Sequence, residues 1–222
     1  MAVTLNLPSR SLVLLSGAPG SGKSTFAERH FLWTQIVSSD RCRAMVCDDE
    51  ENMAVHRQTY SLLKHIVRLR LSLGRFTVVD STALERKHRL AYISMARKYA
   101  FHPVIIVLDV PCELCILQNE QRSRRVPPET IRQYHELLQK TKQSVWNEGF
   151  EKVFVLSPEQ IRTVRIIFGD KDEKGGDNKP EEFTGRRDAG DPFFAKDPGS
   201  QSGGFPQGIG ERNGSGVGGG GE

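Results

Sequence analysis

A glycine-rich segment close to the N-terminus constrains the fold of this chain more than any other feature. It reads Gly17-Ala18-Pro19-Gly20-Ser21-Gly22-Lys23-Ser24-Thr25, between an apolar run at 12–15 and a helix-like segment at 25–30. Glycines let the backbone wrap so that successive N–H groups point inward, and the following helix directs its positive end at the same place. This strand–loop–helix context predicts a loop that binds the phosphates of a nucleoside triphosphate. The alternative, a chance match to a glycine-rich turn, is disfavoured because the complete motif occurs in that context.

The side chains of this loop have different predicted roles. Lys23 would reach the outer phosphates, and the hydroxyl of Ser24 would hold a magnesium ion. The predicted nucleotide-binding residues are Gly17, Gly20, Ser21, Gly22, Lys23, Ser24 and Thr25.

Composition divides the chain into two parts at residue 170. Of the 21 glycines, 15 lie at or beyond this position, and the apolar runs stop at Phe168. We therefore expect 1–169 to form a single domain. We expect 170–222 to be a disordered glycine-rich tail, because it cannot bury enough apolar surface to order itself.

The net charge follows the same division. Residues 170–222 carry −4, which leaves the predicted domain at +8. A domain this basic suits a polyanionic partner, although surface solubility is a simpler explanation. No apolar stretch approaches the roughly 20 residues of a membrane span, and the N-terminus has no signal-peptide core. These features predict a cytoplasmic protein without membrane attachment, and they leave its oligomeric state open.

Five short apolar runs alternate with segments of helical period. The runs cover residues 12–15, 36–37, 76–79, 104–108 and 153–156. Apolar runs without strict alternation are typical of strands that are buried on both faces. The alternation predicts an α/β phosphate-loop fold, with a parallel sheet of about five strands and helices on both faces.

Aspartates follow three of these predicted strands, at the edge of the sheet where ligands bind, and the third of them, Asp109, is expected to be structural. Asp40 is expected to accept a hydrogen bond from an acceptor hydroxyl and then its proton, and a cap of the next helix is the alternative, which is compatible with that role. Arg43 would share a helix face with Asp40 and suits an acceptor that carries its own phosphate. Asp80 is expected to hold the magnesium ion or its water, and a helix cap is again the alternative.

A basic segment follows the fourth predicted strand and its short helix. Arg122 and Arg125 are three residues apart, so a helical start would put both guanidinium groups on one face. An arginine-bearing lid at this point would neutralise charge that develops on the phosphates in the transition state. The alternative is an exposed basic turn.

These segments together resemble the 5′-hydroxyl kinase domain of the bacterial polynucleotide kinase-phosphatases, which are phosphate-loop kinases. Their order and approximate spacing agree over residues 11 to about 160. The phosphate loop is shared by very many proteins, whereas Ser-Ser-Asp-x-Cys-Arg together with the paired arginines is more specific. The matching segments are 17–25, 38–43, 48–50, 77–82 and Asn119-x-x-Arg122-x-x-Arg125.

The resemblance implies transfer of the γ-phosphate of ATP, with Mg²⁺, to the 5′-hydroxyl end of DNA or RNA during nucleic-acid end healing or repair. It makes Asp40 the general base and places Arg43 at the phosphate next to the acceptor nucleotide. It also implies that Arg122 and Arg125 grip the ATP phosphates from the lid. Ala83 departs from the family pattern, because many relatives have asparagine there, and this position bears on acceptor specificity.

Two other functions are compatible with the motifs. A phosphate-loop kinase could instead phosphorylate the hydroxyl of a small molecule, because the loop alone does not separate the two kinds of acceptor. A non-catalytic nucleotide switch is disfavoured, because Asp80-Ser81-Thr82-Ala83 stands where a guanine-nucleotide switch has Asp-x-x-Gly.

Overall fold

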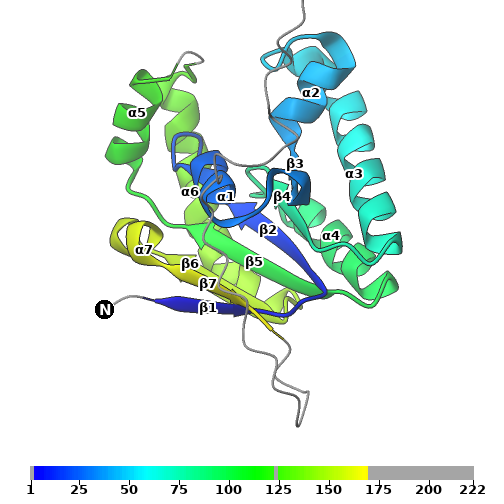
Figure 1. Ribbon diagram of the computed structural model, residues 1–222. Coiled ribbons are helices and arrows are strands. Elements are labelled where there is room, and N and C mark those ends of the chain that lie inside the picture. Colours follow the sequence, from blue (N-terminus) through cyan, green and yellow to red (C-terminus); the bar gives the residue numbers. More distant parts are fainter. Residues whose placement is uncertain (1–2, 123–124, 170–222) are drawn as a thin grey trace, which may run out of the picture. The chain divides into compact units, whose positions relative to one another are not determined.

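A five-stranded parallel sheet forms the centre of the computed structural model, which describes residues 3–122 and 125–169 (Figure 1). The strand order is β3-β4-β2-β5-β6. The strands are β2 (Ser11–Ser16), β3 (Ile36–Ser38), β4 (Thr77–Asp80), β5 (His102–Leu108) and β6 (Lys152–Leu156). The predicted α/β fold with about five parallel strands is confirmed. The predicted tail at 170–222 lies outside the described residues.

The central strand β2 shows why the sheet is covered on both sides. All six of its residues are buried. Leu12 and Leu14 join one core cluster and Val13 and Leu15 join the other, because successive side chains of a strand point to opposite faces. A strand that is buried in this way needs apolar residues at consecutive positions, which is the pattern that the sequence shows.

Helices pack on both faces of the sheet, as predicted. Helices α3 (His56–Ser72), α4 (Arg86–Lys98) and α6 (Pro128–Ser144) contribute to the core cluster on one face. Helices α1 (Lys23–His30) and α7 (Pro158–Thr163) contribute to the cluster on the other face. Helix α6 begins with Pro128, a residue that the first turn tolerates because its N–H group would have no partner there.

A second, two-stranded sheet was not predicted from the sequence. Strand β1 (Thr4–Leu7) pairs in parallel with β7 (Arg165–Phe168), which joins the two ends of the domain. Leu5 and Leu7 are buried in the same cluster as α1. This small sheet therefore covers part of a face on which helices alone were expected.

The remaining helices stand at the carboxyl ends of the strands. Helix α2 (Ser39–Cys47) follows β3, and helix α5 (Cys112–Glu120) lies between β5 and α6. In Figure 1, α5 and α6 stand on one side of α1, whereas α2 and α3 stand on the other side. Short 3₁₀ segments occupy Trp33–Gln35, Met53–Val55 and Val145–Asn147. Within 3–122 and 125–169, no helix has the length and apolar character to cross a bilayer.

Gly20 of the phosphate loop occupies a position at which a side chain has no room. Gly20 has a φ of +83°, and a Cβ there would lie 2.2 Å from the carbonyl oxygen of Cys115 in α5. Real Cβ atoms do not approach backbone oxygens so closely, and L-residues rarely adopt this φ. Helix α5 therefore packs directly against the loop.

We predict that Gly20→Ala destabilises the protein more than Gly74→Ala. Gly74 also has a positive φ, of +71°, but an added Cβ there would meet nothing within 4 Å. Each substitution should cost about 1–2 kcal/mol for the left-handed backbone, and Gly20→Ala should add the clash with α5. Urea denaturation measures the difference, and a nucleotide titration should show weakened ATP binding for Gly20→Ala alone. Equal effects of the two variants would contradict the contact between the loop and α5.

Candidate active site

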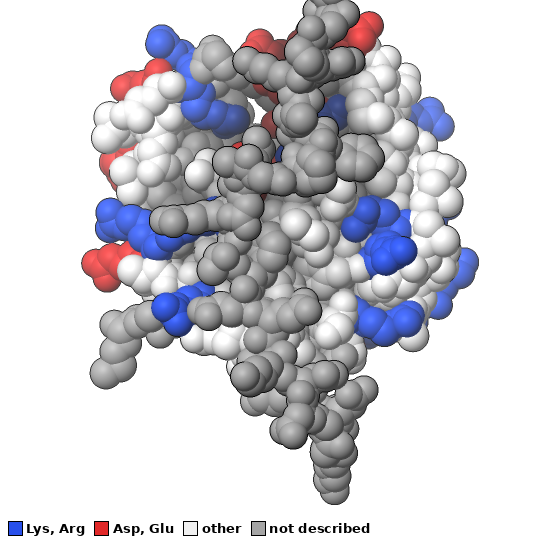
Figure 2. Space-filling view, viewed as in Figure 1, with Lys and Arg blue, Asp and Glu red and all other residues white. Residues whose placement is uncertain are grey.

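A cavity of about 920 Å³ opens at the carboxyl ends of the parallel strands. Of the residues that the sequence analysis assigned to a site, all except Gly17 line it. They are Gly20, Ser21, Gly22, Lys23, Ser24, Thr25, Asp40, Arg43, Asp80, Arg122 and Arg125. The sheet thus brings together residues from four separate segments, because the carboxyl ends of parallel strands meet at one edge. Lys and Arg side chains lie on both flanks of the face shown in Figure 2.

Lys23 lies across the phosphate loop as the first residue of α1. Its Nζ donates hydrogen bonds to the carbonyl oxygens of Gly17 and Ala18, at 2.9 and 2.8 Å. Burial lowers the pKa of Lys23, the Asp80 charge raises it, and the Arg122 charge lowers it further. The lysine ammonium, the positive end of α1 and the loop N–H groups together form an anion-binding site.

The two predicted magnesium ligands are in direct contact. The Ser24 hydroxyl donates to Asp80 Oδ2 at 2.8 Å, which joins the start of α1 to the end of β4. Burial raises the pKa of Asp80, whereas the Lys23 charge and the hydrogen bond from Ser24 lower it. Mg²⁺ prefers oxygen ligands and keeps several waters and nucleotide phosphate oxygens around it. One hydroxyl and one carboxylate beside a phosphate loop fit that requirement.

Asp40 and Arg43 form an ion pair on the first turns of α2, so the predicted shared helix face is confirmed. Arg43 Nη1 donates to Asp40 Oδ1 at 2.7 Å and to the carbonyl oxygen of Glu50 at 2.8 Å. Arg43 is only 4% exposed, and its Nε has no hydrogen-bond partner among the described residues. A buried guanidinium with an unused N–H group at a cavity wall is suited to an anionic ligand.

The two predicted lid arginines both line the cavity, but not from a shared helix face. Helix α5 ends at Glu120, so Arg122 lies beyond its end and Arg125 lies in the connection to α6. The helical placement was therefore wrong, and residues 123–124 between them lie outside the described residues. The charge of Arg122 still acts on Lys23. Both arginines thus supply positive charge on the α5 side of the phosphate loop.

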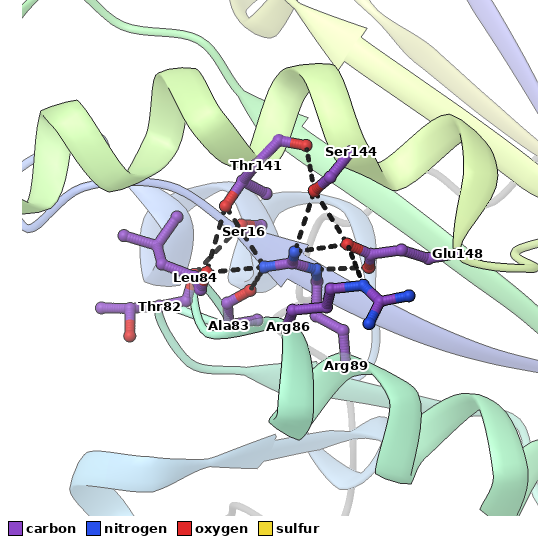
Figure 3. A network of polar contacts seen from close by, with 9 residues as sticks. All are labelled: Ser16, Thr82, Ala83, Leu84, Arg86, Arg89, Thr141, Ser144 and Glu148. Atoms are coloured by element: carbon purple, nitrogen blue, oxygen red, sulfur yellow. Dashed lines mark hydrogen bonds and ion pairs between the residues drawn. The ribbon is translucent and has the colours of Figure 1, made fainter.

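A buried ion pair behind the cavity was not predicted from the sequence (Figure 3). Arg89 and Glu148 are 1% and 7% exposed. Arg89 Nε donates to Glu148 Oε2 at 2.7 Å, and Nη2 donates to Oε1 at 2.6 Å. Arg89 Nη1 also donates to the carbonyl oxygens of Ala83 and Leu84, at 3.0 and 2.7 Å. Arg89 therefore fixes the loop that follows β4 from its rear side.

The loop that follows β4 also contacts the start of the phosphate loop. The carbonyl oxygen of Thr82 accepts hydrogen bonds from the Gly17 N–H at 3.3 Å and from the Ser16 hydroxyl at 3.1 Å. Gly17 is thus held at the start of the phosphate loop, and it is not among the residues that line the cavity. The β4–α4 loop, residues 81–85, therefore connects the buried ion pair to the nucleotide site.

Ala83 lies in the middle of the β4–α4 loop and is part of the core. It is 5% exposed, packs in the cluster that contains α4, and has a φ of +46°. Asparagine adopts this left-handed backbone more readily than alanine. At the position where this chain departs from the family pattern, the residue is therefore buried, has a left-handed backbone and does not line the cavity.

The fold and the site together define a phosphate-loop protein of the kinase-like class. The family model described as an AAA domain, AAA_33, matches residues 12–141, more than half of the chain, and the chain belongs to this family. The match covers the phosphate loop, Asp40, Arg43 and the segment with Arg122 and Arg125.

Two curated relatives share parts of this domain. One is transcription factor bHLH140 of Arabidopsis thaliana, 31% identical over 112 residues, which are 50% of this chain and 12% of the relative. The other, from Autographa californica nuclear polyhedrosis virus, is named as a bifunctional polynucleotide kinase/RNA ligase. It is 30% identical over 155 residues, which are 62% of this chain and 22% of that protein. The chain thus spans less than a quarter of either relative.

A solved structure shares the fold. It is the crystal structure of AvrRxo1-ORF1:-ORF2 with ATP, with a TM-score of 0.50 and 16% sequence identity. The likeness covers 75% of this chain and 56% of that chain. At this level of identity the comparison supports the architecture and carries no information on the acceptor.

We predict that Arg89→Met lowers the free energy of unfolding by about 3–5 kcal/mol, because it leaves the buried Glu148 carboxylate without its close ion-pair partner. Arg86→Met is the matched control on the same helix, since Arg86 contacts Glu148 at 3.8 Å but is 64% exposed. That control should cost no more than about 1 kcal/mol. Urea denaturation of the two variants compares them, and equal losses would contradict the role of Arg89.

The ion pair should also make stability depend on pH. Burial raises the pKa of Glu148, but hydrogen bonds from Arg89 and Ser144 and the Arg89 charge outweigh it and hold the pKa below 4.5. Because the unfolded chain then binds the proton first, this contribution is complete above pH 4.5 and is lost as the pH falls through the folded pKa. The difference in unfolding free energy between the wild type and Glu148→Gln should shrink over that range. A difference independent of pH would contradict the assignment.

Proposed function

We propose that this protein transfers the γ-phosphate of ATP to the 5′-hydroxyl end of DNA or RNA. The observation that carries the proposal is the Asp40–Arg43 pair, which lies in the same cavity as a complete phosphate loop. Membership of a kinase-like phosphate-loop family supports phosphoryl transfer. Asp40 and Arg43, which line the same cavity as the phosphate loop, support the choice of acceptor.

The nucleotide would bind along the loop and the first turn of α1. The loop N–H groups and Lys23 would contact its phosphates, and Arg122 and Arg125 would add positive charge from the α5 side. Ser24 and Asp80 would hold Mg²⁺, which when bound would offset negative charge on the phosphate oxygens. In the proposed arrangement the terminal phosphate would lie in the same cavity that Asp40 lines.

Asp40 would act as the general base. As the acceptor hydroxyl oxygen forms its bond to the γ-phosphorus, the bond from that phosphorus to the β–γ bridging oxygen breaks and ADP leaves. The hydroxyl proton passes to the Asp40 carboxylate. Because the transition state of phosphoryl transfer is loose, positioning and charge would supply most of the rate enhancement.

Arg43 would bind the phosphate that follows the first nucleotide of the acceptor. Its guanidinium is buried and held by Asp40 and by the Glu50 carbonyl, so its direction is set before the acceptor arrives. A 5′-hydroxyl polynucleotide end presents a hydroxyl and a phosphate within one nucleotide, which matches a carboxylate and a guanidinium in contact. The basic charge of the domain and the similarity to the viral kinase/ligase support a polynucleotide acceptor.

We predict that Asp40→Asn lowers the turnover of phosphate transfer about 100-fold while ATP binding is nearly unchanged. The measurement is transfer of label from [γ-³²P]ATP, with magnesium, to a 5′-hydroxyl oligonucleotide, with a 5′-phosphorylated oligonucleotide as the control acceptor. Asp109→Asn is the matched control variant. Asp109 follows β5, pairs with Lys142 at 2.6 Å and is outside the set of residues that line the cavity.

The outcomes of this assay separate the candidate functions. Label on the 5′-hydroxyl strand only, lost in Asp40→Asn and kept in Asp109→Asn, would support a polynucleotide kinase. Unchanged turnover in Asp40→Asn would remove Asp40 from the mechanism. No label on DNA or RNA, with ATP still bound, would indicate a small-molecule acceptor. Lys23→Ala should abolish transfer and background ATP hydrolysis together.

A further inference from the structure

Three ring side chains from two helices line the cavity. They are His56 and Tyr60 on the first turns of α3 and Tyr134 on α6, and we call them the aromatic wall. His56 and Tyr60 are four residues apart and share a helix face, with ring centroids 4.6 Å apart. His88 on α4 stacks on Tyr60 from behind, at 5.4 Å and an interplanar angle of 27°. The rings of the wall are therefore supported by packing.

The aromatic wall adjoins the Asp40–Arg43 pair. Burial raises the pKa of the Tyr60 hydroxyl, and the charges of Tyr134, Arg43 and Asp40 also act on it. Tyr60 is half-buried, whereas the imidazole of His56 is exposed and also faces the cavity. Tyr60 is thus the ring on which the charges of Asp40 and Arg43 act, and His56 is the ring that solvent reaches.

The proposed transfer reaction leaves the aromatic wall without a role. The phosphate loop, the arginines of the α5 side and the Ser24–Asp80 pair account for the triphosphate and the magnesium ion, and Asp40 and Arg43 account for the acceptor hydroxyl and phosphate. Flat rings beside those two groups are suited to a flat, apolar group of the acceptor. In a terminal nucleotide, the nucleobase is the group that remains.

We infer that the aromatic wall binds the nucleobase of the acceptor's terminal nucleotide by stacking, with His56 as the accessible ring. The inference rests on the proposed function and adds a subsite for the acceptor base to it. Stacking on aromatic rings tolerates any base, because every base has a π-face. The wall would therefore select nucleotide ends over acceptors without a planar group, whatever the sequence.

The test compares two acceptors that differ only in the base. One is a 5′-hydroxyl oligonucleotide with an ordinary terminal nucleoside, and the other carries an abasic tetrahydrofuran residue at that position with its 5′-hydroxyl kept. We expect kcat/KM of the wild type to be about tenfold higher for the acceptor with the base. His56→Ala should bring this ratio close to one and leave the KM for ATP unchanged.

Two further variants control for effects unrelated to stacking. His56→Phe keeps a ring and should retain the preference for the base. His65→Ala removes another exposed histidine of α3 that lies outside the cavity lining, and it should behave as the wild type does. A ratio near one in the wild type, or the same ratio in His56→Ala and the wild type, would contradict the inferred role of the aromatic wall. Either result would leave the proposed function unaffected. No transfer to either acceptor by the wild type would overturn both.

Discussion

The buried ion pair between Arg89 and Glu148 is the constraint on which the site depends. One guanidinium binds the Glu148 carboxylate and two carbonyl oxygens of the β4–α4 loop, and that loop in turn holds Gly17 and Ser16 through the Thr82 carbonyl. A buried pair of this kind contributes little net stability, because desolvation offsets the attraction. Its value here is geometric, since it fixes the backbone behind the phosphate loop without occupying the cavity.

The parallel sheet then distributes the chemistry around the cavity. The phosphate loop follows β2, Asp40 follows β3 and Asp80 ends β4, so adjacent strands deliver the phosphate contacts, the proposed base and the proposed metal ligand to one edge. Arginines of the α5 side face the proposed nucleotide, and α2 and α3 carry the groups proposed for the acceptor.

Local sequence signals predicted most of the fold and much of the cavity lining. The phosphate loop, the five strands of the main sheet and the contact between Asp40 and Arg43 followed from motif and spacing, because each depends on residues close in sequence. The helical placement of Arg122 and Arg125 was wrong, because α5 ends at Glu120. The β1–β7 sheet was missed, since four-residue strands leave little pattern and their pairing joins distant segments. The functional assignments of Asp40, Arg43 and the arginines stay predictions.

The sequence by itself determined the class of fold and the phosphate loop, because glycine spacing and apolar runs act through local backbone geometry and burial. Only the tertiary structure decided that Arg89 is a buried partner of Glu148, 59 residues away, and that His56, Tyr60 and Tyr134 face one cavity. Nothing in the sequence around Arg89 distinguishes it from the exposed Arg86 on the same helix. Burial and long-range pairing give these side chains their roles, and both arise only when separate elements pack.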